Sequence, residues 1–170
     1  MVAAWRAAAA GHRVTLLEAN ARLGVKLRIS GGGKCNITHD GPIKELLAAF
    51  PKEQARFLRP AVHRFTNSDV ISLLRREGVE TYTRDNGRVF PADRPGSAAS
   101  VVAAFQGLVG RAGVEVRLKA RVGGLEGQGP HLTGLRLEDG TSLAADAVIL
   151  ASGGASYPET GPPGQALGWL

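Results

Sequence analysis

Three consecutive glycines, Gly31 to Gly33, constrain the fold of this chain more than any other feature of its sequence. A glycine inside a helix or strand costs about 0.5–1 kcal/mol relative to alanine, so three in a row predict a loop. A loop without Cβ atoms lets backbone N–H groups close on an anion or a flat ring, and Lys34 adds a positive charge. The segment is not a P-loop, because its glycine spacing differs and no Ser or Thr follows the lysine. A flexible connector is the alternative interpretation.

The residues before this loop have the pattern of half a nucleotide-binding unit. Residues 1–10 are strong helix formers, and Gly11 follows where a left-handed residue ends a helix. The apolar run 14–17 predicts a strand, and Glu18 closes it. In a dinucleotide-binding βαβ unit such a carboxylate accepts hydrogen bonds from a ribose hydroxyl, and the glycine fingerprint lies about 20 residues earlier. We therefore expect that fingerprint to be encoded upstream of Met1; an ordinary helix–strand pair with a surface Glu is the alternative.

The middle of the chain predicts helices interrupted by a hairpin. Asn67, Ser68 and Asp69 can cap a helix that Gly78 ends. The segment Asp85-Asn86-Gly87 predicts a turn between short strands over 79–83 and 88–90, and a second helix is expected over 97–111.

The C-terminal part predicts β-structure. Short runs separated by glycines indicate an antiparallel meander, over 114–118, 122–126, 132–138 and 142–144. Residues 147–151, AVILA, are a continuous apolar run, which predicts a parallel strand buried on both faces. Ligands of open α/β sheets bind beyond the carboxyl ends of such strands, where Ser152, Gly153 and Gly154 follow; a plain turn is the alternative.

These expectations combine into one α/β domain over residues 1–170, with a parallel sheet, helices and an antiparallel meander. Its expected segments are the half βαβ unit with the glycine loop (1–39), a mainly helical part (40–113), the meander (114–146) and a return strand with the start of a further segment (147–170).

Composition restricts the chemistry. Cys35 is the only cysteine, which excludes an internal disulfide and an all-cysteine zinc site. The four histidines are too scattered to predict a metal site: His12, His39, His63 and His131. No apolar stretch reaches the length of a membrane span, and the N-terminus lacks a secretion signal, so we expect a soluble, cytoplasmic protein without membrane contact.

The net charge of +6 is concentrated near the N-terminus, where residues 1–39 hold six basic side chains against Glu18 alone. The other charges nearly balance, and no run of adjacent Lys or Arg with interleaved aromatics occurs. A dedicated nucleic-acid surface is therefore not expected, whereas a local positive segment suits a phosphate ester.

Four segments, GHRVTLLEA, SGGGKCNIT, GRVFP and ADAVILASGGASYPETG, together resemble the bacterial family of NAD(P)/FAD-dependent oxidoreductases, also described as aminoacetone-oxidase-like flavoproteins. The resemblance covers nearly the whole chain in the same order. It implies part of a glutathione-reductase-like FAD-binding domain, without the first strand and its GxGxxG loop and without the C-terminal half. His39 and the tail 161–170 depart from the family pattern.

The resemblance also implies which residues contact FAD. Glu18 is expected at the adenosine ribose, and the backbone of Val122 at the adenine. The loop against the flavin is expected to comprise Ser30, Gly31, Gly32, Gly33, Lys34, Cys35 and Asn36, and the strand-end contacts Ser152, Gly153, Gly154, Tyr157, Thr160 and Gly161. No catalytic residue is predicted, because hydride chemistry belongs to the flavin ring and Cys35 has no second cysteine as a redox partner.

The leading hypothesis is an FAD-dependent oxidoreductase that transfers hydride or electrons between a small organic substrate and flavin, with NAD(P)H or oxygen open as the second redox partner. A non-catalytic nucleotide-binding module is one alternative. An RNA-modifying flavoprotein is another, to which the sequence pI of about 10.1 contributes. Without a glycine fingerprint the FAD pyrophosphate lacks its backbone cradle, so we expect the 170-residue chain alone to bind FAD poorly.

Overall fold

The computed structural model describes residues 1–92, 96–128, 131–161 and 164–169. The contacts divide into two compact units, which we call unit 1 (residues 1–26 and 105–170) and unit 2 (residues 27–104). This division does not test whether the chain is one domain, which stays a prediction. None of the described helices is long and apolar enough to cross a membrane.

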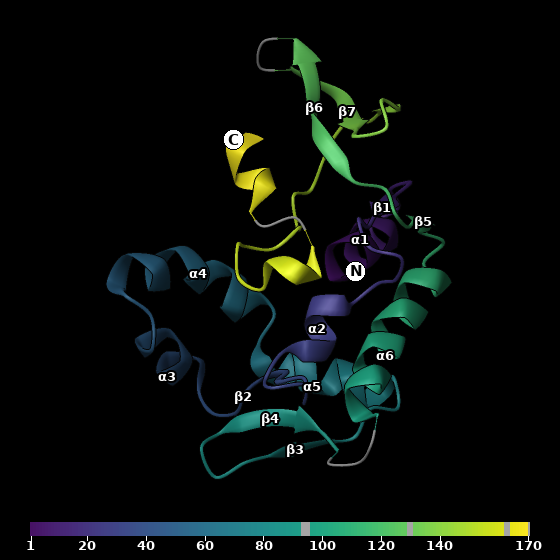
Figure 1. Cartoon of the computed structure of the whole chain (residues 1–170). Helices are drawn as coiled ribbons and strands as arrows, with labels where there is room; N and C mark the ends of the chain where they lie inside the picture. The colour runs from purple at the N-terminus through teal and green to yellow at the C-terminus, as the bar shows by residue number, and fades with distance from the viewer. Residues whose placement is uncertain (93–95, 129–130, 162–163, 170) are drawn as a thin grey trace. The chain divides into compact units, whose positions relative to one another are not determined.

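Unit 1 contains a parallel strand pair, as the α/β class requires. β1 (Thr15–Leu17) pairs with β5 (Glu115–Arg117), so that strands about 100 residues apart in the chain lie side by side. The helix α1 (Val2–Ala9) lies beside the pair in Figure 1, and Gly11 follows it in the left-handed region with φ +91°, as expected. A small apolar cluster of Ala4, Val109 and Val114, with Trp5, Val14 and Leu16 packed against it, joins this helix to the strands.

An antiparallel meander forms the second part of unit 1. Its strands are β6 (Val122–Gln128), β7 (His131–Leu137) and β8 (Ser142–Ala144), in the order β6-β7-β8. Their inner side chains pack around Ala120, Leu135 and Leu137. The run 114–118, which we expected in the meander, instead contains β5, because its backbone finds a parallel partner in β1.

The predicted buried strand at 147–151 is wrong. These residues form neither helix nor strand, and the side chain of Ile149 is 63% exposed. An apolar run becomes a strand only where a neighbour pairs with its backbone, and no strand pairs with it among the described residues. Two short 3-10 helices follow, η1 (Pro158–Thr160) and η2 (Gln165–Trp169). Residues 162, 163 and 170 of the departing tail lie outside the described residues.

Unit 2 combines helices with a three-stranded antiparallel sheet. The helices are α3 (Ile43–Ala48), α4 (Lys52–Arg64) and α5 (Asn67–Arg76), and the strands are β2 (Thr38–His39), β3 (Thr81–Thr83) and β4 (Arg88–Pro91), ordered β2-β4-β3. The hairpin predicted from Asp85-Asn86-Gly87 is confirmed, with Gly87 at φ +76°. Two helices, α2 (Val25–Ile29) and α6 (Ser97–Arg111), run across the boundary between the units.

The start of α5 differs from its prediction. Thr66 is the N-cap: its Oγ1 accepts from the N–H of Asp69 at 3.1 Å, and its own N–H donates to Asp69 Oδ2 at 2.8 Å. The side chain of Asn67 is buried and donates to the backbone oxygens of His39 and Gly41 at 2.8 and 2.9 Å. Asn67 therefore cannot cap its own helix, because its amide holds the end of β2.

Candidate functional site

Glu18 follows the carboxyl end of β1, where the sequence predicts a ribose-binding acid. Its N–H donates to the Arg117 carbonyl at 3.0 Å and its carbonyl accepts from the Ala120 N–H at 2.9 Å. The partly buried carboxylate accepts two hydrogen bonds at Oε1, from the backbone N–H and the Nδ2 of Asn20, at 2.9 and 2.8 Å. Oε2 has no partner among the described residues. The acid is thus held in one orientation with one oxygen left to accept from a ligand hydroxyl.

The amino group of Met1, at the start of α1, is partly buried. Burial lowers its pKa, and the negative charge of Glu18 acts in the opposite direction with a smaller effect. A helix N-terminus offers N–H donors and a partial positive charge. The Glu18 carboxylate can accept from a hydroxyl, and the N–H groups at the start of α1 can donate to an anion.

Asn20 joins Glu18 to the segment around η1. Its Nδ2 also donates to the Thr160 carbonyl at 2.9 Å, and a Cβ at Gly161 would lie 3.7 Å from that nitrogen. Thr160 is buried, and its Oγ1 donates to the Tyr157 carbonyl at 2.7 Å. The structure thus brings Glu18, Thr160 and Gly161 together through a residue that the sequence analysis missed.

Lys26 is a second missed residue. Its Nζ donates to the Gly154 carbonyl at 3.3 Å and would lie 3.7 Å from a Cβ at Gly153, which has φ +82°. The sequence feature that could have identified Lys26 is the positively charged segment 1–39, to which it belongs. The glycine pair after the run 147–151 therefore lies beside an ammonium group, while Ser152 and Tyr157 are exposed.

Val122 starts β6 opposite Leu137 and packs against the cluster around Ala120. Because the Ala120 N–H donates to the Glu18 carbonyl, the backbone leading into β6 is tied to the acid. The contact of Val122 with adenine stays a prediction.

The predicted flavin loop lies in unit 2. The Gly33 N–H donates to the Ile29 carbonyl at 3.0 Å and the Cys35 N–H to the Ser30 carbonyl at 2.8 Å, which closes a tight loop. All three glycines have positive φ, and a Cβ at Gly31 would lie 2.8 Å from the Asn36 nitrogen. Gly31 is therefore required for packing, whereas substituents at the other two glycines would point into open space.

The side chains of Asn36 and Cys35 stabilise the loop and are not available to a ligand. The Asn36 amide nitrogen, facing its acceptors, donates to the backbone oxygens of Val89 and Thr38, both at 3.1 Å. Cys35 is fully buried, and burial raises the pKa of its thiol, so the group is neutral at pH 7 and not a nucleophile. The exposed part of the loop consists of its glycines and Lys34.

The structure thus separates the predicted contacts into two sets. Unit 1 gathers Glu18, Thr160 and Gly161 around Asn20, with Gly153 and Gly154 beside Lys26. The loop Ser30–Asn36 forms a surface of unit 2.

Comparisons with known proteins identify relatives whose sequence identities to this chain are nearly equal. Two are ribosomal RNA dihydrouridine synthases: that of Escherichia coli is 29% identical over 89% of this chain and 36% of its own length, and that of Haemophilus influenzae is 27% identical over 89% and 37%. A third is the 3-dehydro-bile acid delta(4,6)-reductase of Clostridium scindens, 28% identical over 89% and 35%. The chain spans little more than a third of the length of these relatives.

A family model, described as the HI0933-like protein Rossmann domain, matches residues 1–170. The parallel strand pair with its helix and the acid after β1 agree with a Rossmann-type domain. The chain therefore belongs to the HI0933-like family of FAD-binding Rossmann-domain proteins.

Proposed function

We propose that this chain forms the adenosine-binding part of the FAD site of a flavin-dependent oxidoreductase. The observation that carries the proposal is the Glu18 carboxylate at the end of β1, whose Oε1 is held by Asn20 and whose Oε2 has no partner in the described part of the chain. A carboxylate with one unpartnered oxygen suits a ribose hydroxyl, because a hydrogen bond to a charged group contributes about 1.5–3 kcal/mol.

The other residues of unit 1 fit the same ligand. Lys26, beside Gly153 and Gly154, supplies a positive charge near backbone that no Cβ covers, which suits a phosphate. Flavin, when bound, supplies the hydride or single-electron chemistry. The residues of unit 1 would position the adenosine and its phosphates. In unit 2, taken by itself, Gly32 and Gly33 of the loop Ser30–Asn36 leave backbone that a flat ring can approach.

For the substrate we propose two candidate classes, which follow from the names of the relatives. The name of the Clostridium scindens relative describes a reductase of a small organic molecule, which supports a small organic substrate. The names of the other two describe a dihydrouridine synthase of ribosomal RNA, which supports RNA as the second candidate substrate. A reductase needs an electron donor, and we propose NAD(P)H for that role.

The proposal is tested by titrating the isotopically labelled chain with ADP and with FAD while recording amide NMR spectra, which detect binding even at millimolar dissociation constants. We expect shifts at the amides of Glu18, Asn20 and Thr160. Glu18→Gln should weaken ADP binding about tenfold, which corresponds to about 1.4 kcal/mol. The matched control Glu45→Gln changes an exposed acid of α3 and should leave the affinity unchanged.

Spectra that stay unchanged at these amides, or equal losses in both variants, would contradict an adenosine site at Glu18. The oxidoreductase activity is tested on the protein as its gene encodes it. If that protein is purified without flavin and cannot take up FAD in a visible-absorption titration, the nucleotide-binding module becomes the better interpretation.

A further inference from the structure

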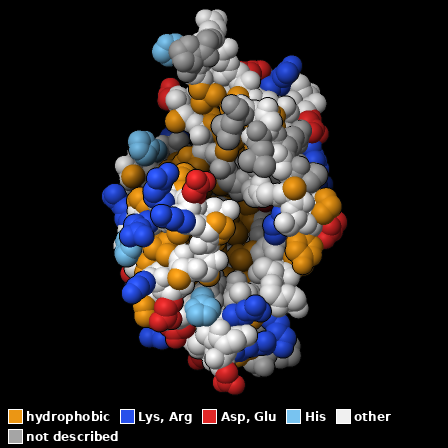
Figure 2. Space-filling view, turned by 90° about the vertical axis from the view of Figure 1, so that its left-hand side faces the viewer, with side chains coloured by type: hydrophobic (Ala, Val, Ile, Leu, Met, Phe, Trp, Pro, Cys, Tyr) orange, Lys and Arg blue, Asp and Glu red, His pale blue; other side chains and the backbone are white. Residues whose placement is uncertain are grey.

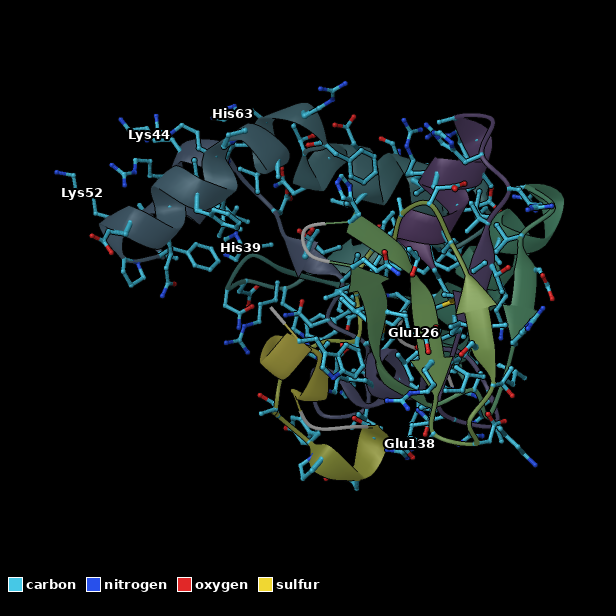
Figure 3. All side chains as sticks on the ribbon, turned by 90° about the horizontal axis from the view of Figure 1, so that it is seen from above. His39, Lys44, Lys52, His63, Glu126 and Glu138 are labelled. Carbon is cyan, nitrogen blue, oxygen red and sulfur yellow. The ribbon has the colours of Figure 1, made fainter. Side chains whose placement is uncertain are left out.

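The helix α4 carries four basic side chains along one side. Lys52, Arg56, Arg59 and His63 follow one another at intervals of four, three and four residues, and all are exposed. At 3.6 residues per turn this spacing places them within an arc of about 60° around the helix. Figure 3 labels Lys52 and His63 on this helix and Lys44 on α3. We call the four residues the basic stripe.

The basic stripe faces outward because the helix packs through another side. Ala55, Leu58 and Val62 are its partly buried side chains, and they repeat at intervals of three and four residues. Packing of this apolar row leaves the basic stripe in solvent. Figure 2 shows several Lys and Arg side chains gathered on the side of the molecule that α3 and α4 occupy.

One acid of α4 lies near the basic stripe. Glu53 is three residues before Arg56 and about 60° from it around the helix, so it offsets part of the positive charge, but no ion pair joins it to the stripe among the described residues. The three cations Lys52, Arg56 and Arg59 repel one another, and an opposing row of anions would remove that repulsion.

We propose that the basic stripe binds the phosphate backbone of a nucleic-acid strand without reading its bases. The charges recur about 4.5–6 Å apart along the helix axis, so they can meet successive phosphates. Lys and Arg are the usual phosphate-contacting residues, and the stripe contains no Asn or Gln of the kind that reads adenine.

The same geometry disfavours a membrane surface. A helix that lies on a membrane needs a broad apolar face turned to the lipid, whereas the apolar row of α4 is narrow and already partly buried. Phe57 is 85% exposed, but it follows Arg56 directly and so lies about 100° away from it around the helix. One aromatic ring away from the stripe does not provide that face.

This inference does not depend on the flavin proposal, because it concerns residues of α4 alone. Counting charges along the chain could not reveal the stripe, since Glu45 and Glu53 offset part of the positive charge of 43–64. The helical period gathers the four basic side chains on one side of α4, which a count along the sequence does not show.

The test measures fluorescence anisotropy of a labelled 20-nucleotide single-stranded RNA of mixed sequence, titrated with the full chain between 50 and 300 mM salt. On a single strand, each phosphate that a basic side chain neutralises contributes about −0.7 to the slope of log affinity against log salt concentration. Three to four such contacts therefore predict a slope of about −2 to −3. Arg56→Glu with Arg59→Glu should weaken binding at least tenfold and reduce the slope.

The matched control is Arg75→Glu with Arg88→Glu, two exposed arginines of unit 2 outside the stripe. Both double variants lower the net charge from +6 to +2, so net charge alone affects them equally. We expect the control to lose less than threefold in affinity, with both variants folded by circular dichroism and their amide NMR spectra unchanged away from the substituted residues.

Equal losses in the two variants, salt-independent binding or no binding at 50 mM salt would overturn the proposal. Stronger binding of the chain to phosphatidylserine vesicles than to RNA, lost in the stripe variant, would also overturn it in favour of a membrane surface.

Discussion

A single amide, that of Asn20, holds the end of β1 to the segment around η1. Asn20→Ala removes its bonds to the Glu18 carboxylate and to the carbonyl of the buried Thr160. We expect a loss of about 1–3 kcal/mol in the free energy of unfolding, because the carbonyl is left without its partner. Urea unfolding followed by tryptophan fluorescence measures it.

Asn20→Asp tests the direction of these bonds. A carboxylate cannot donate, and it places a second negative charge beside Glu18, so this variant should be less stable than Asn20→Ala at pH 7. Equal stability of Asn20→Asp and the unaltered chain would show that Nδ2 makes no stabilising contact.

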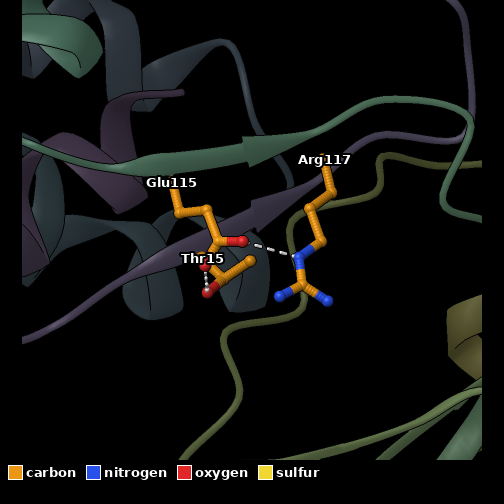
Figure 4. A network of polar contacts seen from close by, with 3 residues as sticks. All are labelled: Thr15, Glu115 and Arg117. Carbon is orange, nitrogen blue, oxygen red and sulfur yellow. Dashed lines mark hydrogen bonds and ion pairs between the residues drawn. The ribbon is translucent and has the colours of Figure 1, made fainter.

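Glu115 is the centre of a network across β1 and β5 (Figure 4). Its Oε1 accepts from Arg117 Nε at 2.8 Å and its Oε2 from Thr15 Oγ1 at 3.1 Å. These hydrogen bonds, that of Arg117 first, lower the pKa of the Glu115 carboxyl below its ordinary value.

A folded-state pKa below the unfolded one means that the charged carboxylate stabilises the fold above the unfolded pKa. The contribution disappears as the pH falls through the folded pKa. Arg117→Ala should raise the pKa of Glu115 towards its ordinary value, as measured by NMR titration of the carboxyl carbon. An unchanged pKa would mean that Arg117 does not hold Glu115 in solution.

Glu18 and Asn20 show which parts of the candidate site the sequence could predict and which it could not. Glu18 was predictable because it directly follows an apolar strand. Asn20 was not, because its acceptor, Thr160, lies 140 residues away in the chain. Local patterns reveal which groups a strand end carries, whereas the contacts that hold them arise from the folded chain.

At the scale of elements, a glycine in a strand and a glycine in a helix differ in what a substitution does to them. A Cβ at Gly134 in β7 would overlap the Leu143 carbonyl oxygen of β8, whereas a Cβ at Gly110 in α6 would meet nothing within 4 Å. Gly134→Ala should therefore force the strands apart and cost about 1–3 kcal/mol. Gly110→Ala should be neutral or stabilise by up to about 1 kcal/mol, because alanine favours the helix.

Thermal unfolding followed by circular dichroism compares the two variants, and each serves as the control of the other. A stabilising Gly134→Ala would show that β7 and β8 are not paired as described.

Elements with local signals were predicted, and those that depend on distant partners were not. The helix expected over 97–111 is confirmed as α6, since the apolar period lies within it and Gly113 follows its end. The run 114–118 was assigned to the wrong sheet because its partner is β1. The apolar composition of residues 147–151 did not predict their structure correctly, because a strand forms only where another strand pairs with its backbone.

At the scale of the whole molecule, the α/β class was predicted and the family model agrees with it. The resemblance rested on short blocks in a fixed order, which report common ancestry even where single elements are mispredicted. The arrangement of compact units was not predictable, because α2 and α6 have no break in sequence where the units divide.

The burial of Cys35 has a practical consequence for studying these units. Cys35 is the only cysteine, and its side chain has no exposed surface within unit 2, so a chromogenic disulfide reagent reaches it only after that unit opens. Both tryptophans, Trp5 and Trp169, lie in unit 1. The natural chain therefore contains two intrinsic probes, one for each unit. We expect thiol exposure and fluorescence to share one urea midpoint, since α2 and α6 are common to both units; a separate, lower midpoint for the thiol would mean that unit 2 opens on its own.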